Sequence, residues 1–151
     1  MTLPKTGVKE AILGVIHAQD VAWCKGDAIA FGASALPDIV FTNVVGMFWV
    51  GVEPFIAQHA HIFSTIYEGS QLAQALAHLT TVADDIAIVD TVASVAGYRQ
   101  LPPGVTAIDG VLQTRLEQVL VRRDGIWRVQ SFHNVPVNPA AVARRDVAPP
   151  G

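Results

Sequence analysis

The sequence predicts a single α+β domain, in which helices cover one face of a curved, cone-shaped antiparallel sheet. Helical periodicity opens the chain, a β-branched segment and a third helix follow, and long apolar strands close it. The 151 residues, 51% of them hydrophobic, suffice for one cored domain and leave no room for a second. We expect one domain over 1–151, with a core over about 6–135 and a loosely held, Pro-rich tail over 136–151.

Two helices are expected before any strand. Apolar residues at spacings of three and four predict an amphipathic helix over about 6–25. Gly26 supplies its C-terminal stop, and Asp27 can cap a second, shorter helix over 28–35. Pro37 ends that second helix, because proline cannot continue the hydrogen-bond ladder.

A hairpin and a third helix occupy the middle of the chain. The β-branched run that begins at Asp38 is punctuated by Gly46 before a short Met-Phe-Trp-Val segment, which predicts two paired strands. Pro54 then lies in the first turn of a helix over about 53–67, where proline is tolerated. His59 falls on the apolar face of this helix.

Four strands complete the prediction, over 71–82, 86–98, 111–122 and 126–135. Asp-Asp and Asp-Gly pairs mark the tight turns before the second and the fourth of them, which favours an antiparallel meander. A strongly curved sheet of this kind makes a cone. Its narrow end is filled by side chains, and its open end leaves an apolar cavity for a small ligand.

The final hairpin has a predicted register. If Asp124 and Gly125 form a two-residue turn, Val119 pairs with Gln130 and Glu117 pairs with Phe132. One face then carries Arg115, Glu117, Val119, Val121, Gln130, Phe132 and Asn134, and the other carries Leu116, Gln118, Leu120, Trp127, Val129, Ser131 and His133. Both faces are substantially apolar, so we expect a homodimer through the outer face; a one-residue bulge at the turn would exchange the two faces.

Composition narrows the class of partner. Ten Lys and Arg against 13 Asp and Glu give a net charge of −3, and no basic run is present, so nucleic acid is not an expected partner. No apolar stretch reaches the ~20 residues of a membrane-spanning helix, and no export signal is recognisable, which favours a cytoplasmic protein. Cys24 is the only cysteine, so we expect neither an internal disulfide nor a multi-cysteine metal site.

Three polar side chains stand out as candidates for chemistry. Arg115 and Glu117 lie two residues apart in an otherwise apolar strand and so project to the same side. They form either a polar anchor in the cavity, with Glu117 as a proton carrier, or a structural pair at a subunit interface. His59 is either an acid, base or hydrogen-bond donor at the cavity wall or a histidine satisfied within the core.

Several segments resemble one superfamily. They are Trp23-Cys24-Lys25-Gly26-Asp27, Phe41-Thr42-Asn43-Val44-Val45-Gly46, Trp49-Val50-Gly51 and Asp124-Gly125-Ile126-Trp127-Arg128. Their order resembles the nuclear-transport-factor-2-like superfamily over about 6–135, and within it the SnoaL-like proteins of the group named after SgcJ and EcaC. The resemblance implies a cystatin-like fold, but it does not fix an activity, because one fold carries many functions.

The resemblance also suggests roles for particular residues. Ketosteroid isomerase, a relative by resemblance, uses an Asp base with a Tyr and a protonated Asp. Its motifs place the Tyr at Gln19, the base at Asn43 and the second Asp at Glu117. Gln19 and Asn43 would then bind a ligand oxygen, and Glu117, tuned by Arg115, would move a proton. The expected cavity wall consists of Trp23, Trp49, Phe63 and Phe132.

The sequence therefore favours a dimeric protein without cofactor or metal, whose cavity binds a small, mostly apolar organic molecule. Acid-base chemistry of the isomerase, cyclase or hydratase type is the leading possibility, with Glu117, His59 and Asn43 as catalytic candidates. A similarity to limonene epoxide hydrolase at Phe41-Thr42-Asn43 is a minor alternative. The competing hypothesis is a non-catalytic binding or accessory protein, and the third is a dimerisation domain with a filled cone.

Overall fold

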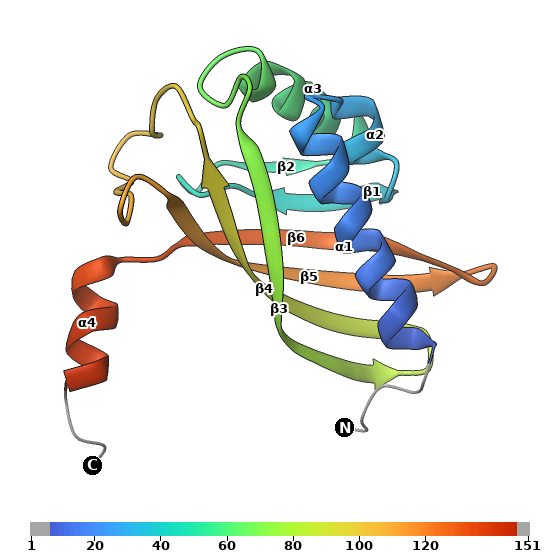
Figure 1. The fold of residues 1–151 in the computed structure, drawn as a ribbon. Helices are drawn as coiled ribbons and strands as arrows, with labels where there is room; N and C mark the ends of the chain where they lie inside the picture. The colour runs from blue at the N-terminus through green and yellow to red at the C-terminus, as the bar shows by residue number, and fades with distance from the viewer. Residues whose placement is uncertain (1–6, 148–151) are drawn as a thin grey trace.

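The computed structural model describes residues 7–147, which form one curved six-stranded sheet and four helices (Figure 1). The elements are α1 (Val8–Cys24), α2 (Ala28–Gly32), β1 (Ala35–Thr42), β2 (Phe48–Val50), α3 (Val52–Phe63), β3 (Gln71–Ala83), β4 (Ile86–Ala96), β5 (Leu112–Arg123), β6 (Ile126–Pro136) and α4 (Pro139–Val147). The predicted α+β class and curved sheet are confirmed.

The first helices form where the periodicity and the capping residues place them. The face of α1 that points at the sheet is buried and consists of Ile12, Ile16, Gln19, Ala22 and Trp23. Asp27 caps α2, because its side chain accepts a hydrogen bond of 2.9 Å from the backbone nitrogen of Ala30. The helix is shorter than predicted, and β1 already begins at Ala35. Pro37 lies inside this strand, at an irregular stretch of the ladder where a missing donor is tolerated.

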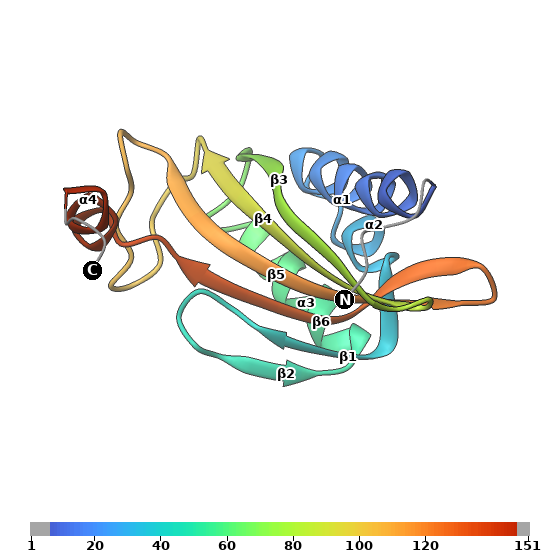
Figure 2. The same cartoon turned by 90° about the horizontal axis from the view of Figure 1, so that it is seen from below.

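The strand order is β2-β1-β6-β5-β4-β3, and the strands lie side by side in Figure 2. The meander from β3 to β6 is antiparallel, as predicted. The sheet as a whole is mixed, however, because β1 pairs in parallel with β6, with Phe41 beside Phe132. The predicted antiparallel sheet is therefore confirmed except at this one pair. The parallel pair joins the N-terminal hairpin to the last strand of the meander.

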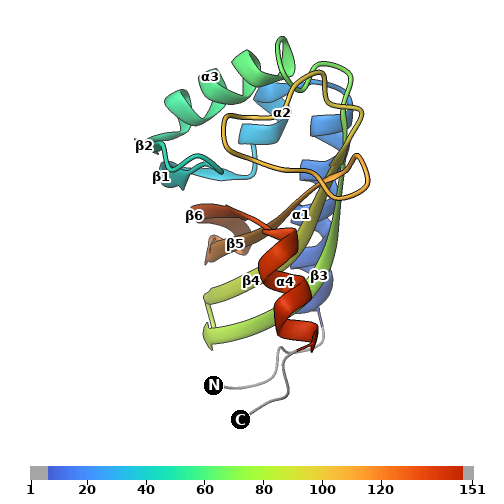
Figure 3. The same ribbon diagram turned by 90° about the vertical axis from the view of Figure 1, so that its left-hand side faces the viewer.

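Three helices cover one face of the sheet. α1 packs against β3, and α2 lies between α1 and α3 (Figure 1). α4 projects beyond the end of β6, apart from the other helices in Figure 1 and toward the viewer in Figure 3. The tail was expected to be loose, but 139–147 form this helix, which begins where the Asn138 side chain accepts hydrogen bonds from the backbone nitrogens of Ala140 and Ala141. Residues 148–151 lie outside the described residues.

The final hairpin contains a bulge that changes which side chains face inward. Arg123 opposes Ile126 as predicted, but the register shifts between Val119 and Leu120. Glu117 consequently pairs with His133 and not with Phe132, and Val119 pairs with Ser131 and not with Gln130. The inner face now carries Leu116, Gln118, Leu120, Trp127, Val129, Phe132 and Asn134. One extra residue in β6 is enough for this exchange, because side chains alternate between the faces of a strand.

Candidate functional site

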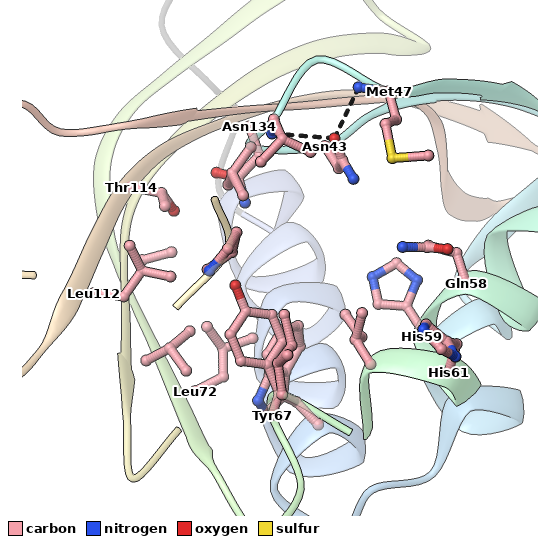
Figure 4. A pocket seen from close by; sticks show the side chains of 18 of the residues that line it. Asn43, Met47, Gln58, His59, His61, Tyr67, Leu72, Leu112, Thr114 and Asn134 are labelled. Carbon is pink, nitrogen blue, oxygen red and sulfur yellow. Dashed lines mark hydrogen bonds between the residues drawn. The ribbon is translucent and has the colours of Figure 1, made fainter. Parts of the chain in front are cut away.

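A cavity of about 240 Å³ opens between the inner face of the sheet, the C-terminal half of α3 and the 100–103 loop (Figure 4). Its wall is mainly apolar and includes Trp23, Phe31, Phe41, Leu72, Leu112 and Phe132. Among the residues that the structure describes, no Asp, Glu, Lys or Arg lines it. The polar atoms that reach the cavity therefore belong to neutral side chains and to histidines.

His59 is a buried titratable group of this wall. It is only 2% exposed and lies within a cage of aromatic rings, with ring centroids 4.4 Å from Phe31 and 4.5 Å from Phe55. Its Nδ1 lies 2.8 Å from the carbonyl oxygen of Phe55, which can only accept, so Nδ1 carries the hydrogen. Nε2 is left as an acceptor on the edge of the ring that faces the cavity (Figure 4). Burial lowers the pKa of His59 to about 4, so the imidazole is neutral at pH 7.

Tyr67 enters the cavity from the turn that follows α3. The side chain is 7% exposed and packs against Trp23 at 5.3 Å between ring centroids. Its hydroxyl points into the cavity (Figure 4) and makes no hydrogen bond to the described part of the chain. Burial raises the pKa of Tyr67 to about 12, so at neutral pH the hydroxyl stays protonated and can donate a hydrogen bond.

Two asparagines lie on the opposite side of the cavity from Tyr67 (Figure 4). The Oδ1 of Asn43 accepts hydrogen bonds from the backbone nitrogens of Val45 and Met47, at 3.1 and 2.9 Å, and so holds the turn between β1 and β2. This leaves the amide nitrogen of Asn43 unpaired within residues 7–147. The Oδ1 of Asn134 is buried away from the open space of the cavity and has no hydrogen-bond partner among residues 7–147. An unpaired buried acceptor of this kind costs about 1–3 kcal/mol of folding free energy.

The Arg115 and Glu117 pair does not lie in the cavity. Both side chains are exposed on the outer face of the sheet. The bulge in β6 did not move them; it moved Phe132 and Asn134 to the opposite, inner face. The proposed meeting of Asn43, Arg115 and Glu117 was wrong, and with it the role of Glu117 as a proton carrier in the cavity.

Gln19 also has a different environment from the one expected. It is 2% exposed, and its amide exchanges two hydrogen bonds with Gln118, of 2.6 and 3.0 Å. Its Oε1 additionally accepts a bond of 3.1 Å from Gln74. Gln19 does not line the cavity, and a buried network of amides satisfies it. The expectation that it binds a ligand oxygen is therefore corrected.

The aromatic candidates divide into two layers. Trp23 and Phe132 lie at the cavity wall, whereas Trp49 and Phe63 lie behind it. Trp49 stacks on Phe41 at 5.3 Å, and Phe63 packs edge-on against Trp23 at 4.9 Å. The two outer rings support the wall but are not part of it, so their expected contact with a ligand is corrected.

The sequence reasoning did not propose Tyr67 or Asn134. Tyr67 lies eight residues after His59 and continues the same apolar face beyond the end of α3, which is a signal that helical spacing contains. Asn134 lies two residues after Phe132 and shares its face. Within residues 7–147, no three His, Cys, Asp or Glu side chains are grouped so that they could hold a metal ion.

Comparisons with known proteins identify the fold. No family model matches the chain, and no curated protein matches it. An uncharacterised protein with a cystatin-like fold from Caulobacter vibrioides is 29% identical, with a TM-score of 0.78 over 92% of this chain and 96% of that one. The chain is also similar to a protein from Novosphingobium aromaticivorans that is provisionally named scytalone dehydratase (14% identity, TM-score 0.72, 86% and 84% coverage). A ketosteroid isomerase-like protein from Erwinia carotovora atroseptica gives 17% identity, a TM-score of 0.69, and 86% and 96% coverage.

The chain thus has a cystatin-like fold, and the fold that the resemblance in the sequence implies is confirmed. The narrower resemblance to the SnoaL-like group stays a prediction. Proteins of this fold include isomerase-like and dehydratase-like members. No helix among the described residues is both long enough and apolar enough to cross a bilayer.

Proposed function

We propose that the protein binds a small, uncharged, mostly apolar organic molecule in the cavity between the sheet and α3. The observation that carries this proposal is an apolar cavity to which Asn43, His59 and Tyr67 nevertheless present polar atoms without a hydrogen-bond partner among residues 7–147. The cavity of about 240 Å³ is larger than the about 150 Å³ that accommodates benzene and smaller than the about 300–1,000 Å³ of drug-sized sites. A molecule of one or two rings fits between these limits.

The charge of the wall supports an uncharged ligand. A carboxylate or an ammonium group would lose its hydration on entering the cavity and find no opposite charge among the lining residues. His59 does not supply one, because burial keeps it neutral at pH 7. We therefore expect neutral compounds to bind and their charged counterparts to be rejected.

The experiment compares 2-naphthol with 2-naphthoate by the fluorescence of the tryptophans, since Trp23 lies in the cavity wall. We expect saturable binding of the naphthol and no binding of the naphthoate at pH 7. Ala93→Phe places a ring in the cavity and should abolish binding, because Ala93 is buried in the wall. Ala96→Phe, at an exposed position of the same strand, is the matched control. Binding that survives Ala93→Phe would place the ligand elsewhere and refute the proposal.

Proton transfer of the isomerase or dehydratase type is a second candidate, favoured by the pairing of a neutral base with a neutral donor in one cavity. Nε2 of His59 could accept a proton from a carbon next to a carbonyl group, while the Tyr67 hydroxyl stabilises the oxyanion that forms. The likenesses to dehydratase-like and isomerase-like proteins support this reading. It replaces the carboxylate-based mechanism, since Glu117 is on the outer face.

Deuterium exchange tests this second candidate separately from binding. The ketone 2-tetralone has two rings and acidic α-protons, so it serves as a probe in D₂O with mass detection. We expect exchange faster than in buffer alone, and its loss in His59→Gln with retained binding. Binding without accelerated exchange would overturn catalysis by His59 and leave the binding proposal standing.

We also propose that a second copy of the chain covers the outer face of the sheet. A row of paired positions crosses this face through Val50, Val40, Ser131, Val119 and Ile88. Two acidic residues, Asp90 and Glu117, lie beside this row, next to Arg115. In a dimer with two-fold symmetry, the acidic residues of one copy can face Arg115 of the other copy. Analytical ultracentrifugation should give a dimer, and Val119→Asp should give a monomer. A wild-type monomer at micromolar concentration would refute the interface.

A further inference from the structure

We propose that the ligand consists of a neutral ring, held in the cavity, and an unbranched alkyl tail that leaves through the mouth of the cavity, over the turn between β1 and β2. The inference rests on the proposed binding function and names the class of ligand, an alkyl-substituted ring. It starts from Val45 and Met47, two apolar residues that line the cavity and are nevertheless exposed to water.

The turn between β1 and β2 is more apolar than its geometry requires. The Oδ1 of Asn43 accepts hydrogen bonds from two backbone nitrogens of the turn, and Gly46 adopts a φ of 84°, which favours glycine. The other three residues are Val44, Val45 and Met47, whereas turns usually carry small or polar side chains. Hydrogen bonding within the turn does not explain these apolar side chains.

Val45 and Met47 mark the mouth of the cavity, which is the part where its wall meets the solvent. Val45 is 42% exposed and Met47 is 52% exposed, although both residues line the cavity. The Met47 side chain lies on the far side of the cavity from Leu112 and Thr114, which are both buried (Figure 4). A ligand small enough to lie wholly among the buried residues would leave both apolar side chains of the turn in water.

The mouth has apolar side chains on its other sides as well. Ile62 of α3 and Ile66 of the following turn are half-buried, and both line the cavity. The 100–103 loop contributes half-buried Leu101 and exposed Pro103. The polar side chains between them are amides, a hydroxyl group and an imidazole, and no described lining residue is an Asp, Glu, Lys or Arg. The mouth therefore suits a hydrocarbon chain.

Continuity favours a tail of the ligand over a separate partner as the occupant of the mouth. The exposed apolar residues and the buried wall line one and the same cavity, so a single molecule that extends outward contacts both. The side chain of Met47 is unbranched and flexible, and it can follow a chain of methylene groups. A fully buried methylene raises affinity about fourfold, so a methylene covered on one side only should raise it about twofold.

Calorimetric titration with 4-ethylphenol and 4-hexylphenol measures this gain. The longer compound has four more methylene groups, so we expect it to bind the wild-type protein about tenfold or more tightly. Val45→Ser combined with Met47→Ser should reduce the preference to less than about threefold and leave the affinity for 4-ethylphenol unchanged. Phe48→Ser is the matched control. Phe48 is 59% exposed in the same hairpin but does not line the cavity, so the preference should persist.

A charged group at the end of the tail tests whether the tail reaches solvent. The acid 6-(4-hydroxyphenyl)hexanoate carries its carboxylate five methylene groups from the ring, whereas 4-hydroxybenzoate carries it on the ring. We expect the first compound to bind at least as tightly as 4-ethylphenol at pH 7, because its carboxylate keeps its hydration, and the second not to bind. Rejection of both compounds would mean that the tail stays inside the cavity, and the proposal would be overturned.

The outcomes separate this inference from the function on which it rests. Equal affinity for 4-ethylphenol and 4-hexylphenol, a preference that survives in the double variant, or one that Phe48→Ser also removes would overturn the tail site while the cavity proposal stands. If 4-ethylphenol does not bind the wild-type protein, the proposed function itself fails. Sedimentation of the double variant should match that of the wild type. A change in oligomeric state would mean that a second copy covers the mouth, which also refutes the tail.

Discussion

The stability of the protein should depend on pH through His59, and the size of the effect follows from its cage. In the unfolded chain the imidazole has its ordinary pKa of 6.5, whereas in the folded protein burial lowers that pKa to about 4. Between these two values the unfolded state binds a proton that the folded state does not. The free energy of unfolding therefore rises with pH in this window, and the contribution of His59 is lost as the pH falls through it.

The pKa of His59 is lower in the folded protein by about two and a half units. Because one unit corresponds to about 1.4 kcal/mol, the full effect on the free energy of unfolding is about 3 kcal/mol. Urea denaturation at pH 7.5, 6.5, 5.5 and 4.5 measures it, with the wild type compared against His59→Phe. The phenyl ring suits a site already surrounded by Phe31, Phe41 and Phe55 but cannot take up a proton. The difference between the two profiles isolates His59, because the carboxylates contribute equally to both.

A matched control separates titration from packing. Phe63→Leu perturbs the same aromatic cluster and removes no titratable group. It should lower the free energy of unfolding by the same amount at every pH. The dependence of that free energy on pH should therefore stay as in the wild type. The reasoning is refuted if the wild type and His59→Phe give parallel profiles between pH 7.5 and 4.5.

Three further changes test the packing of the molecule by denaturation at pH 7. Asn134→Leu should raise the free energy of unfolding by about 1 kcal/mol, because it removes an unpaired buried oxygen; a loss of stability would mean that this oxygen has a partner. Gly32→Ala should cost about 1–3 kcal/mol, since the new Cβ would lie 2.4 Å from Cγ1 of Ile56, and adding Ile56→Ala should make the pair less than additive. Gln118→Leu should cost about 1–3 kcal/mol by leaving the amide of buried Gln19 without its acceptor, and a double-mutant cycle with Gln19→Leu should show the coupling.

The sequence was sufficient for the fold because each element carries its own local signal. Periodicity identified α1, Asp27 identified the start of α2, and the turn residues separated the strands of the meander. The parallel pairing of β1 with β6 has no such signal, because it depends on contacts between distant parts of the chain. The local pattern also extended α2 to residue 35. The helix ends earlier, because β1 begins at Ala35 and pairs with another strand there.

The site was predicted less well, and one residue explains why Phe132 and Glu117 were assigned to the same face. The bulge in β6 adds a residue that no local pattern announces, and it reverses the faces of everything that follows. Phe132 was expected beside Glu117 and lies instead on the opposite face, together with Asn134. His59 was found because helical spacing is insensitive to strand register.

The parallel β1–β6 pair has a consequence for how the chain reaches its final form. The first strand has its partner near the far end of the chain, so a nascent chain leaving the ribosome cannot complete the sheet until β6 has emerged. Until then β1 and β2 have only each other, and a lone two-stranded hairpin is at best marginally stable. The strands of the meander pair only with their neighbours in the sequence, so β3, β4 and β5 can pair before β6 has emerged. The cavity, which needs side chains from both parts, is among the last features to take shape.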